Sequence, residues 1–210
     1  MANNSPFQSG KIRFFTEERR AERCLTIEER YKLFQACSDF LKPIILTALK
    51  TGMRQGEILN LKWEHVNLEN ATIHVSNTKS GKARDLPIHP QLLECLSTLP
   101  KNSPYVFCDN NGNPLTRYGK LRHEFEYALK KANISGFRFH DLRHTFASIL
   151  AMKGVDLLTI KYYLGHSSLE MTMRYAHLLP DHKQFAIQLL GREESYPAAT
   201  EIKSVETITV

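Results

Sequence analysis

Several features that mark particular classes of protein are missing from this 210-residue sequence. It has only four cysteines and no C-x-x-C pair, which argues against a zinc ribbon and against a disulfide framework. No apolar run approaches the about 18 residues of a membrane span, and the N-terminus lacks the core of a signal peptide. We therefore expect a soluble, cytoplasmic protein without a membrane partner. Its expected free thiols are Cys24, Cys37, Cys95 and Cys108.

The chain also lacks internal repeats, low-complexity segments and an excess of acidic residues. It has 28 Lys and Arg against 22 Asp and Glu, which gives a formal net charge of +6 and a pI near 9.1. A basic balance suits a polyanionic partner, with nucleic acid ahead of an anionic membrane surface, but charge alone is a weak signal. A hydrophobic content of 42% is ample for the core of one ordinary domain.

Composition divides the chain into three parts. Residues 1–24 are polar and charge-rich and form a linker-like lead-in, residues 25–195 carry the expected domain, and residues 196–210 form a tail. The tail is β-prone after Pro197. We expect either a frayed end or a candidate exchange strand that adds to a sheet edge in its own or a neighbouring subunit.

The domain itself is expected to be α+β and mostly helical, with a small antiparallel β-hairpin. Thr26 and Glu29 form a capping box that predicts the first helix. Its core-facing residues are predicted to be Ile27, Tyr31, Leu33 and Phe34. Gly52 is a natural helix stop, and a turn at Ser80-Gly81 within 71–89 predicts the hairpin. Further helices are expected near 54–62, 91–98, 117–132, 141–152, 156–163, 168–175 and 181–190; Ser167 and Glu170 form a second capping box before the helix at 168.

Four segments stand out as candidates for chemistry: 51–59, 77–84, 139–148 and 164–177. Each has an ordinary structural explanation when it is taken alone. Arg54 suits a solvated helix start, and Lys79 suits a strand edge. Tyr175 at helical spacing suits a core.

The two histidines of the third segment raise the question of a metal site. His140 and His144 share the spacing of an H-x-x-x-H zinc site. Position 141 is Asp instead of the protease Glu, however, and no third ligand has a compelling spacing. A packing role for His144 is therefore the stronger interpretation.

Taken together, the segments supply what phosphoryl transfer through a tyrosine requires. Arg54 and Arg143 are suited to gripping the two non-bridging oxygens of a phosphate through their planar guanidinium groups. His140 lies three residues from Arg143, so the two share a helix face. His166 precedes the expected helix at Ser167, whose N-terminus would favour an anion.

These segments, in this order and at these separations, resemble the tyrosine recombinase or phage integrase family from about residue 22 to residue 190. The most specific elements are H-x-x-R at 140–143, L-G-H at 164–166 and a tyrosine nine residues further on. The resemblance implies the fold of a tyrosine recombinase catalytic domain. It also implies site-specific DNA recombination or integration, as carried out by mobile elements, through a 3′-phosphotyrosine intermediate.

The resemblance also assigns roles to residues. It implies that Tyr175 is the nucleophile, that Lys79 is a general acid on the hairpin, and that Glu57 supports the site. The implied catalytic set is Arg54, Lys79, His140, Arg143, His166 and Tyr175. No metal and no cofactor are implied. The implied partners are double-stranded DNA and three further copies of the chain, in a homotetramer on DNA, with a monomer as the alternative state of the isolated chain.

Two alternatives remain at this stage: a type IB topoisomerase, and a DNA-binding module without catalysis. The first tends to carry lysine where this chain has His140. The presence of every matching polar residue speaks against the second. Members of the family usually carry a separate N-terminal DNA-binding domain, whereas only the linker-like lead-in precedes the expected domain here. We therefore expect weak, salt-sensitive DNA binding by the chain alone.

Overall fold

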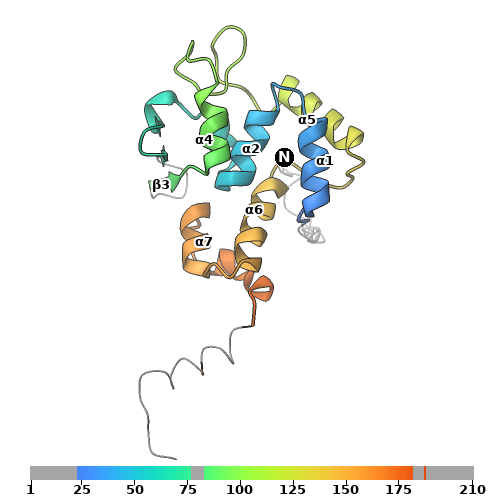
Figure 1. The fold of residues 1–210 in the computed structure, drawn as a ribbon, viewed down its shortest axis with the longest axis vertical. Coiled ribbons are helices and arrows are strands. Elements are labelled where there is room, and N and C mark those ends of the chain that lie inside the picture. The colour runs from blue at the N-terminus through green and yellow to red at the C-terminus, as the bar shows by residue number, and fades with distance from the viewer. Residues whose placement is uncertain (1–22, 77–82, 182–186, 188–210) are drawn as a thin grey trace, which may run out of the picture.

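The computed structural model describes residues 23–76, 83–181 and 187. It confirms a mostly helical α+β architecture (Figure 1). The helices are α1 (Ile27–Ala36), α2 (Lys42–Thr51), α3 (Gln55–Leu59), α4 (Pro90–Ser97), α5 (Lys120–Lys131), α6 (Asp141–Met152), α7 (Leu157–Leu164) and α8 (Glu170–Met173), with short 3₁₀ turns at Trp63–His65 (η1) and Ala176–Leu178 (η2). The strands are β1 (Val66–Asn67), β2 (Thr72–Val75) and β3 (Arg84–Pro87). Among the described residues, no helix is both long and apolar enough to span a membrane.

Helix α1 begins where the capping box predicts. The Thr26 side chain accepts from the Glu29 backbone N–H, and the Glu29 carboxylate accepts from the backbone N–H of Thr26. The expected buried face was only partly right. Leu33 is fully buried, but Ile27 and Tyr31 are 71% and 67% exposed because α1 packs mainly along one side, against α5.

The sheet is three-stranded and antiparallel, in the order β1-β2-β3. The predicted hairpin is confirmed by the pairing of β2 with β3, in which Ile73 lies opposite Leu86 and Val75 opposite Arg84. Burial alternates along both strands, so Ile73, Val75, Arg84 and Leu86 face inward. Strand β1 has only two residues, too few to show an alternating pattern in the sequence.

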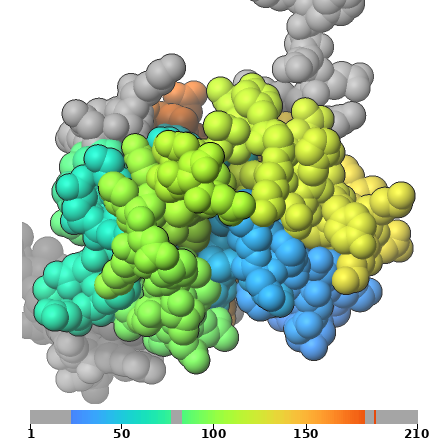
Figure 2. Space-filling view, turned by 90° about the horizontal axis from the view of Figure 1, so that it is seen from above, coloured from blue at the N-terminus to red at the C-terminus, as the bar shows by residue number. Residues whose placement is uncertain are grey.

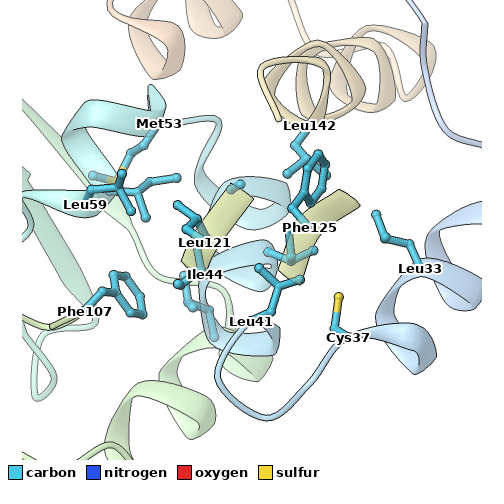
Figure 3. Packing of buried hydrophobic residues seen from close by; sticks show 14 of the residues in the cluster. Leu33, Cys37, Leu41, Ile44, Met53, Leu59, Phe107, Leu121, Phe125 and Leu142 are labelled. Atoms are coloured by element: carbon cyan, nitrogen blue, oxygen red, sulfur yellow. The ribbon is translucent and has the colours of Figure 1, made fainter. Parts of the chain in front are cut away.

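Helix α2 lies at the centre of the main core and packs against both α4 and α6. Figure 3 shows Leu41 and Ile44 beside Leu121, Phe125 and Leu142, which come from distant parts of the chain. The helix ends at Gly52 in the left-handed conformation, with φ of 64°, as predicted. In the view of Figure 2, α1 (blue) and α5 (yellow) lie side by side on one face of the molecule.

The C-terminal elements form a second, smaller core beside α6. Its buried residues are Phe146, Ala147, Ala151, Ile160, Leu164 and Tyr175. Figure 1 shows α7 against the lower half of α6, on the side away from α1. Helix α6 has the predicted bounds, and Asp156 caps α7 by accepting from two backbone N–H groups.

The expected helix at 168–175 was wrong in its extent. Helix α8 has only four residues, begins at Glu170 and has no side-chain cap, and the Ser167 hydroxyl contacts Met171 Sδ instead of the backbone. The chain then turns into η2, so Tyr175 lies after the helix and not within it. The predicted capping box and helix N-terminal anion site at Ser167 are therefore absent from this segment.

Some expectations fall outside the described residues. These are Lys79 and the turn at Ser80-Gly81, the lead-in up to residue 22, the helix predicted at 181–190 (described only at 181 and 187), and the tail at 196–210.

Candidate active site

Arg54 stands at the N-terminus of α3, where it caps the helix together with Glu57. The Glu57 carboxylate accepts from the Arg54 backbone N–H at 2.9 Å and from Arg54 Nη1 at 3.0 Å. Arg54 Nη2 donates to the carbonyl of Gly165, also at 3.0 Å. The ordinary i,i+3 ion pair is thus present, and it holds the Arg54 guanidinium against the α7–α8 turn.

Glu57 also pairs with Arg84, a residue that the sequence reasoning missed. Arg84 Nη2 lies 2.8 Å from Glu57 Oε2, and Arg84 Nη1 lies 3.3 Å from Glu57 Oε1. Both side chains are buried, at 2% and 8% exposure. Arg84 Nε donates to the carbonyl of Tyr163. The signal in the sequence was the strand parity that Arg84 shares with the buried Leu86 and Ile88.

This pairing fixes the charge of Glu57. Burial alone would raise the pKa of its carboxyl, but the hydrogen bonds and charge of Arg84, with a further contribution from Arg54, outweigh burial and hold the pKa below its usual range. Glu57 is therefore an anion at neutral pH, and it orients two arginines from different elements.

Arg143 projects from the first turn of α6 into the same region. Its Nη1 donates to the carbonyl of Gly52 at 2.8 Å, and its Nη2 donates to the carbonyl of Leu164. Burial, together with the positive charge of Arg54, lowers the pKa of Arg143 to about 9. It remains a cation at neutral pH, and an anion placed beside Arg143 and Arg54 would relieve their repulsion.

Gly165 forms the turn that brings these contacts together. Its φ of 60° is left-handed, and a Cβ there would lie 2.7 Å from Arg84 Nη1. Because the carbonyls of Leu164 and Gly165 hold Arg143 and Arg54, one glycine turn orients both candidate phosphate-binding groups.

The two predicted site histidines flank the arginines. Burial and nearby positive charge lower the pKa of His140 to about 4 and that of His166 to about 3, so both are neutral at pH 7. After burial, the largest contributions to the lowered pKa of His140 come from His144 and Arg143. For His166 they come from Arg143 and Arg54. His166 Nδ1 lies 2.9 Å from the hydroxyl of the buried Thr172, which fixes the ring's orientation.

Tyr175 is 2% exposed and belongs to the second core, yet its hydroxyl makes a polar contact with a residue of α6. Tyr175 Oη lies 2.7 Å from Nδ1 of His144, which is itself 8% exposed. The packing role predicted for His144 therefore includes a polar contact that the sequence did not indicate.

The structure thus brings together five of the predicted residues around Arg143, namely Arg54, Glu57, His140, His166 and Tyr175; Lys79 lies outside the described residues. Arg54, Glu57 and His140 also line a groove of about 1270 Å³. Within the described part of the chain, no group of three His, Cys, Asp or Glu is arranged to hold a metal ion.

Residues 23–182 match the model of the phage integrase family. The chain belongs to the phage integrase family. It is 34% identical over 175 residues to the integrase of Salmonella phage P22, covering 76% of this chain and 45% of that protein. It spans about half the length of the curated relatives it matches, with 45% and 50% covered in two phage integrases.

Solved structures agree with the family assignment. The catalytic domain of bacteriophage HP1 integrase is 34% identical with a TM-score of 0.67, over 83% of this chain and 98% of that domain. A XerH site-specific recombinase bound to a palindromic difH substrate in a post-cleavage complex is 27% identical with a TM-score of 0.62, over 83% of this chain and 54% of that one. These similarities confirm the predicted fold of a tyrosine recombinase catalytic domain.

Proposed function

We propose that residues 25–195 form the catalytic domain of a site-specific DNA recombinase that breaks and rejoins DNA through a 3′-phosphotyrosine at Tyr175. The observation that carries the proposal is the contact of the Tyr175 hydroxyl with His144, the residue that follows Arg143 on α6. The groups that act on Arg143 include Arg54, Glu57 and Arg84. This arrangement offers a nucleophile, and two cations for a phosphate, within one small region.

In the proposed reaction, Tyr175 Oη forms a bond to the scissile phosphorus while the bond to the 5′-oxygen breaks. Arg54 and Arg143 bind the non-bridging oxygens and offset the charge that develops there. His140 and His166 are neutral, so each has a ring N–H that is suited to donate to a phosphate oxygen. Lys79 gives a proton to the departing 5′-oxygen. A 5′-hydroxyl from a partner strand then attacks the phosphotyrosine, which exchanges the strands.

Double-stranded DNA is the proposed substrate, and a homotetramer on two sites is the proposed assembly, with the tail at 196–210 as the segment exchanged between subunits. The net charge of +6 supports a DNA partner. The XerH relative bound to its difH substrate supports the same choice. We place the reaction in the cytoplasm. The reaction needs no cofactor, because the arginines supply the positive charge that Mg²⁺ supplies in other phosphoryl transferases.

Covalent capture of DNA tests the proposal. A library of nicked duplexes with randomised sequence traps any 3′-phosphotyrosine, because the short fragment beyond the nick diffuses away after cleavage. We expect SDS-stable protein–DNA adducts from the wild-type chain, formed equally well in excess chelator. Tyr175→Phe removes only the hydroxyl, so we expect it to bind DNA but to give no adduct. Adducts formed by the Phe variant, or none formed by the wild type on any member of the library, would overturn the proposal.

A further inference from the structure

One polar contact of the nucleophile is not explained by the roles given above. Tyr175 Oη lies 2.7 Å from His144 Nδ1, a distance typical of a well-formed hydrogen bond. Both side chains are almost completely buried, with 2% and 8% of their surface exposed. They come from different elements, α6 and the segment before η2, so their contact is a product of the tertiary fold.

Base catalysis requires one direction of this hydrogen bond. A neutral phenol donates its proton to an unprotonated ring nitrogen, so the hydrogen of neutral His144 is then on Nε2. A free phenol is almost wholly protonated at neutral pH, so attack on phosphorus requires a base in contact with the hydroxyl. His144 is already in that contact, and a histidine titrates near the pH at which such a base is most effective.

The other two histidines are less suited to this task. Burial and neighbouring cations lower the pKa of His140 to about 4 and that of His166 to about 3, which makes both weak bases. His166 Nδ1 is also engaged by the Thr172 hydroxyl at 2.9 Å. His140 meets the ring of His144 edge to face, with centroids 4.9 Å apart, so it helps to hold the plane of the His144 ring.

The surroundings of His144 suit a proton acceptor that becomes charged while a phosphate is bound. The ionisable groups that the structure places in this region come from several elements. They are Arg138, His140, Asp141 and Arg143 at α6, Arg54 and Glu57 at α3, Arg84 on β3, His166 after α7, and Arg174 and Tyr175 after α8. The arginines outnumber the carboxylates among these groups. The negative charge of a bound phosphodiester would attract a proton on His144.

We propose that His144 is a further catalytic residue, whose Nδ1 takes the proton from Tyr175 Oη as the hydroxyl attacks the scissile phosphate. The step balances: the Oη–H bond breaks and Nδ1–H forms, the Oη–P bond forms, and the bond from phosphorus to the 5′-oxygen breaks. The 5′-oxygen takes its proton from Lys79. In the reverse direction the leaving phenolate takes its proton back from His144.

The inference rests on the proposed function, so the experiment first establishes that wild-type protein gives a Tyr175 adduct on a captured nicked duplex. Absence of that adduct would count against the proposed function alone. His144→Asn then keeps an oxygen acceptor near the position of Nδ1 but cannot accept the proton. We expect its cleavage rate to fall by about 10²–10³-fold while its DNA affinity is unchanged. We also expect its cleavage rate to depend less on acidic pH than the wild-type rate does.

Fluorination of Tyr175 distinguishes a base from a structural residue. A fluorinated tyrosine, incorporated at position 175, ionises more readily and needs less help from a base. We therefore expect it to restore much of the cleavage lost in His144→Asn. The same fluorotyrosine should not restore His140→Asn, a matched variant of the neighbouring histidine.

Three results would overturn the inference. The first is a cleavage rate of His144→Asn within about threefold of wild type, and the second is a faster rate, which would mean that the contact holds Tyr175 in an inactive position. The third is a cleavage defect that fluorination of Tyr175 leaves unchanged. Should His144→Asn lose DNA binding or melt early, fluorotyrosine in the otherwise wild-type chain carries the test. Its cleavage rate at neutral pH is expected to change with the acidity of the phenol, and an unchanged rate would contradict proton transfer in the rate-limiting step.

Discussion

Glu57 and Arg84 form a buried ion pair that joins the start of α3 to β3, with Oε2 and Nη2 2.8 Å apart. Through Glu57 the pair reaches Arg54, and through Tyr163 and the Gly165 turn it reaches the segment that carries His166. Three elements that are distant in the sequence therefore meet at two charged side chains. The pair positions the candidate site, although neither residue belongs to the implied catalytic set, which Glu57 is expected only to support.

Breaking this pair is expected to destabilise the fold. Glu57→Gln leaves the Arg84 guanidinium buried without a counter-charge, and removal of one partner from a buried pair costs about 3–5 kcal/mol. Urea unfolding measures the change in the free energy of unfolding. The matched control is Glu126→Gln, whose ion pair with Arg122 is exposed, so we expect no resolvable change. Equal effects of the two substitutions would contradict the role given to Glu57 and Arg84.

The Gly165 turn gives a second prediction. In Gly165→Ala, the new Cβ would lie within 2.7 Å of Arg84 Nη1, and the left-handed backbone adds strain. The displaced turn would move the carbonyls that hold Arg54 and Arg143, so we expect DNA cleavage to fall by at least about tenfold while DNA binding falls less. Covalent capture and a binding titration measure the two effects.

Gly136→Ala is the control for that substitution. Gly136 has a similar φ of 66°, but nothing lies within 4 Å of its Cβ position, so the variant carries the backbone strain without the clash. We expect a modest loss of stability, about 1–2 kcal/mol, and unchanged cleavage. If Gly136→Ala impairs cleavage as strongly as Gly165→Ala, the contact with Arg84 does not explain the effect.

The site histidines make stability depend on pH. In the unfolded chain they bind protons near the ordinary histidine value, whereas the folded pKa values are about 4 for His140 and about 3 for His166. Between those values the unfolded state holds more protons, so the free energy of unfolding falls as the pH is lowered from about 6.5. Urea midpoints at pH 7.5 and pH 5 measure the slope.

Substitution separates the contributions to this slope. His140→Asn combined with His166→Asn is expected to reduce it, and His123→Asn, at an exposed position of α5, is expected to leave it unchanged. A slope that is the same in all three proteins would contradict the assignment of neutral histidines to the folded site.

The sequence predicted local features well. Helix α6 has its expected bounds, and the capping box at Thr26 and the stop at Gly52 depend only on neighbouring residues. Ser167 failed although it satisfies the same local pattern, because the chain turns into η2 after four helical residues. A capping motif fixes a helix start only where the following residues stay helical.

The contacts that sequence reasoning missed connect residues that are far apart. Arg84 and Glu57 are 27 positions apart, and His144 and Tyr175 are 31 positions apart. No periodicity or spacing rule links such pairs, because only the packed fold brings them into contact. The resemblance to the integrase family assigned roles to the residues expected around the phosphate and to Glu57, but it assigned none to the buried Arg84 or His144.

The last prediction concerns Lys79, the proposed general acid, which lies in the connection between β2 and β3. Strand β3 begins at Arg84, which is hydrogen-bonded to Glu57 and to the carbonyl of Tyr163. The end of the connection at β3 therefore lies beside the candidate site. We expect the rate at which Lys79→Ala cleaves an ordinary duplex to fall by about 10²–10⁴-fold, because the 5′-oxygen then leaves without a proton. A duplex with sulfur at the 5′-bridging position should restore the rate, since a thiolate leaves without protonation. Covalent capture on both duplexes gives the comparison, and Lys82→Ala, a lysine removed from the same connection, should behave alike on both. An equal defect of Lys79→Ala on oxygen and sulfur substrates would show that Lys79 binds the phosphate instead of protonating the leaving group.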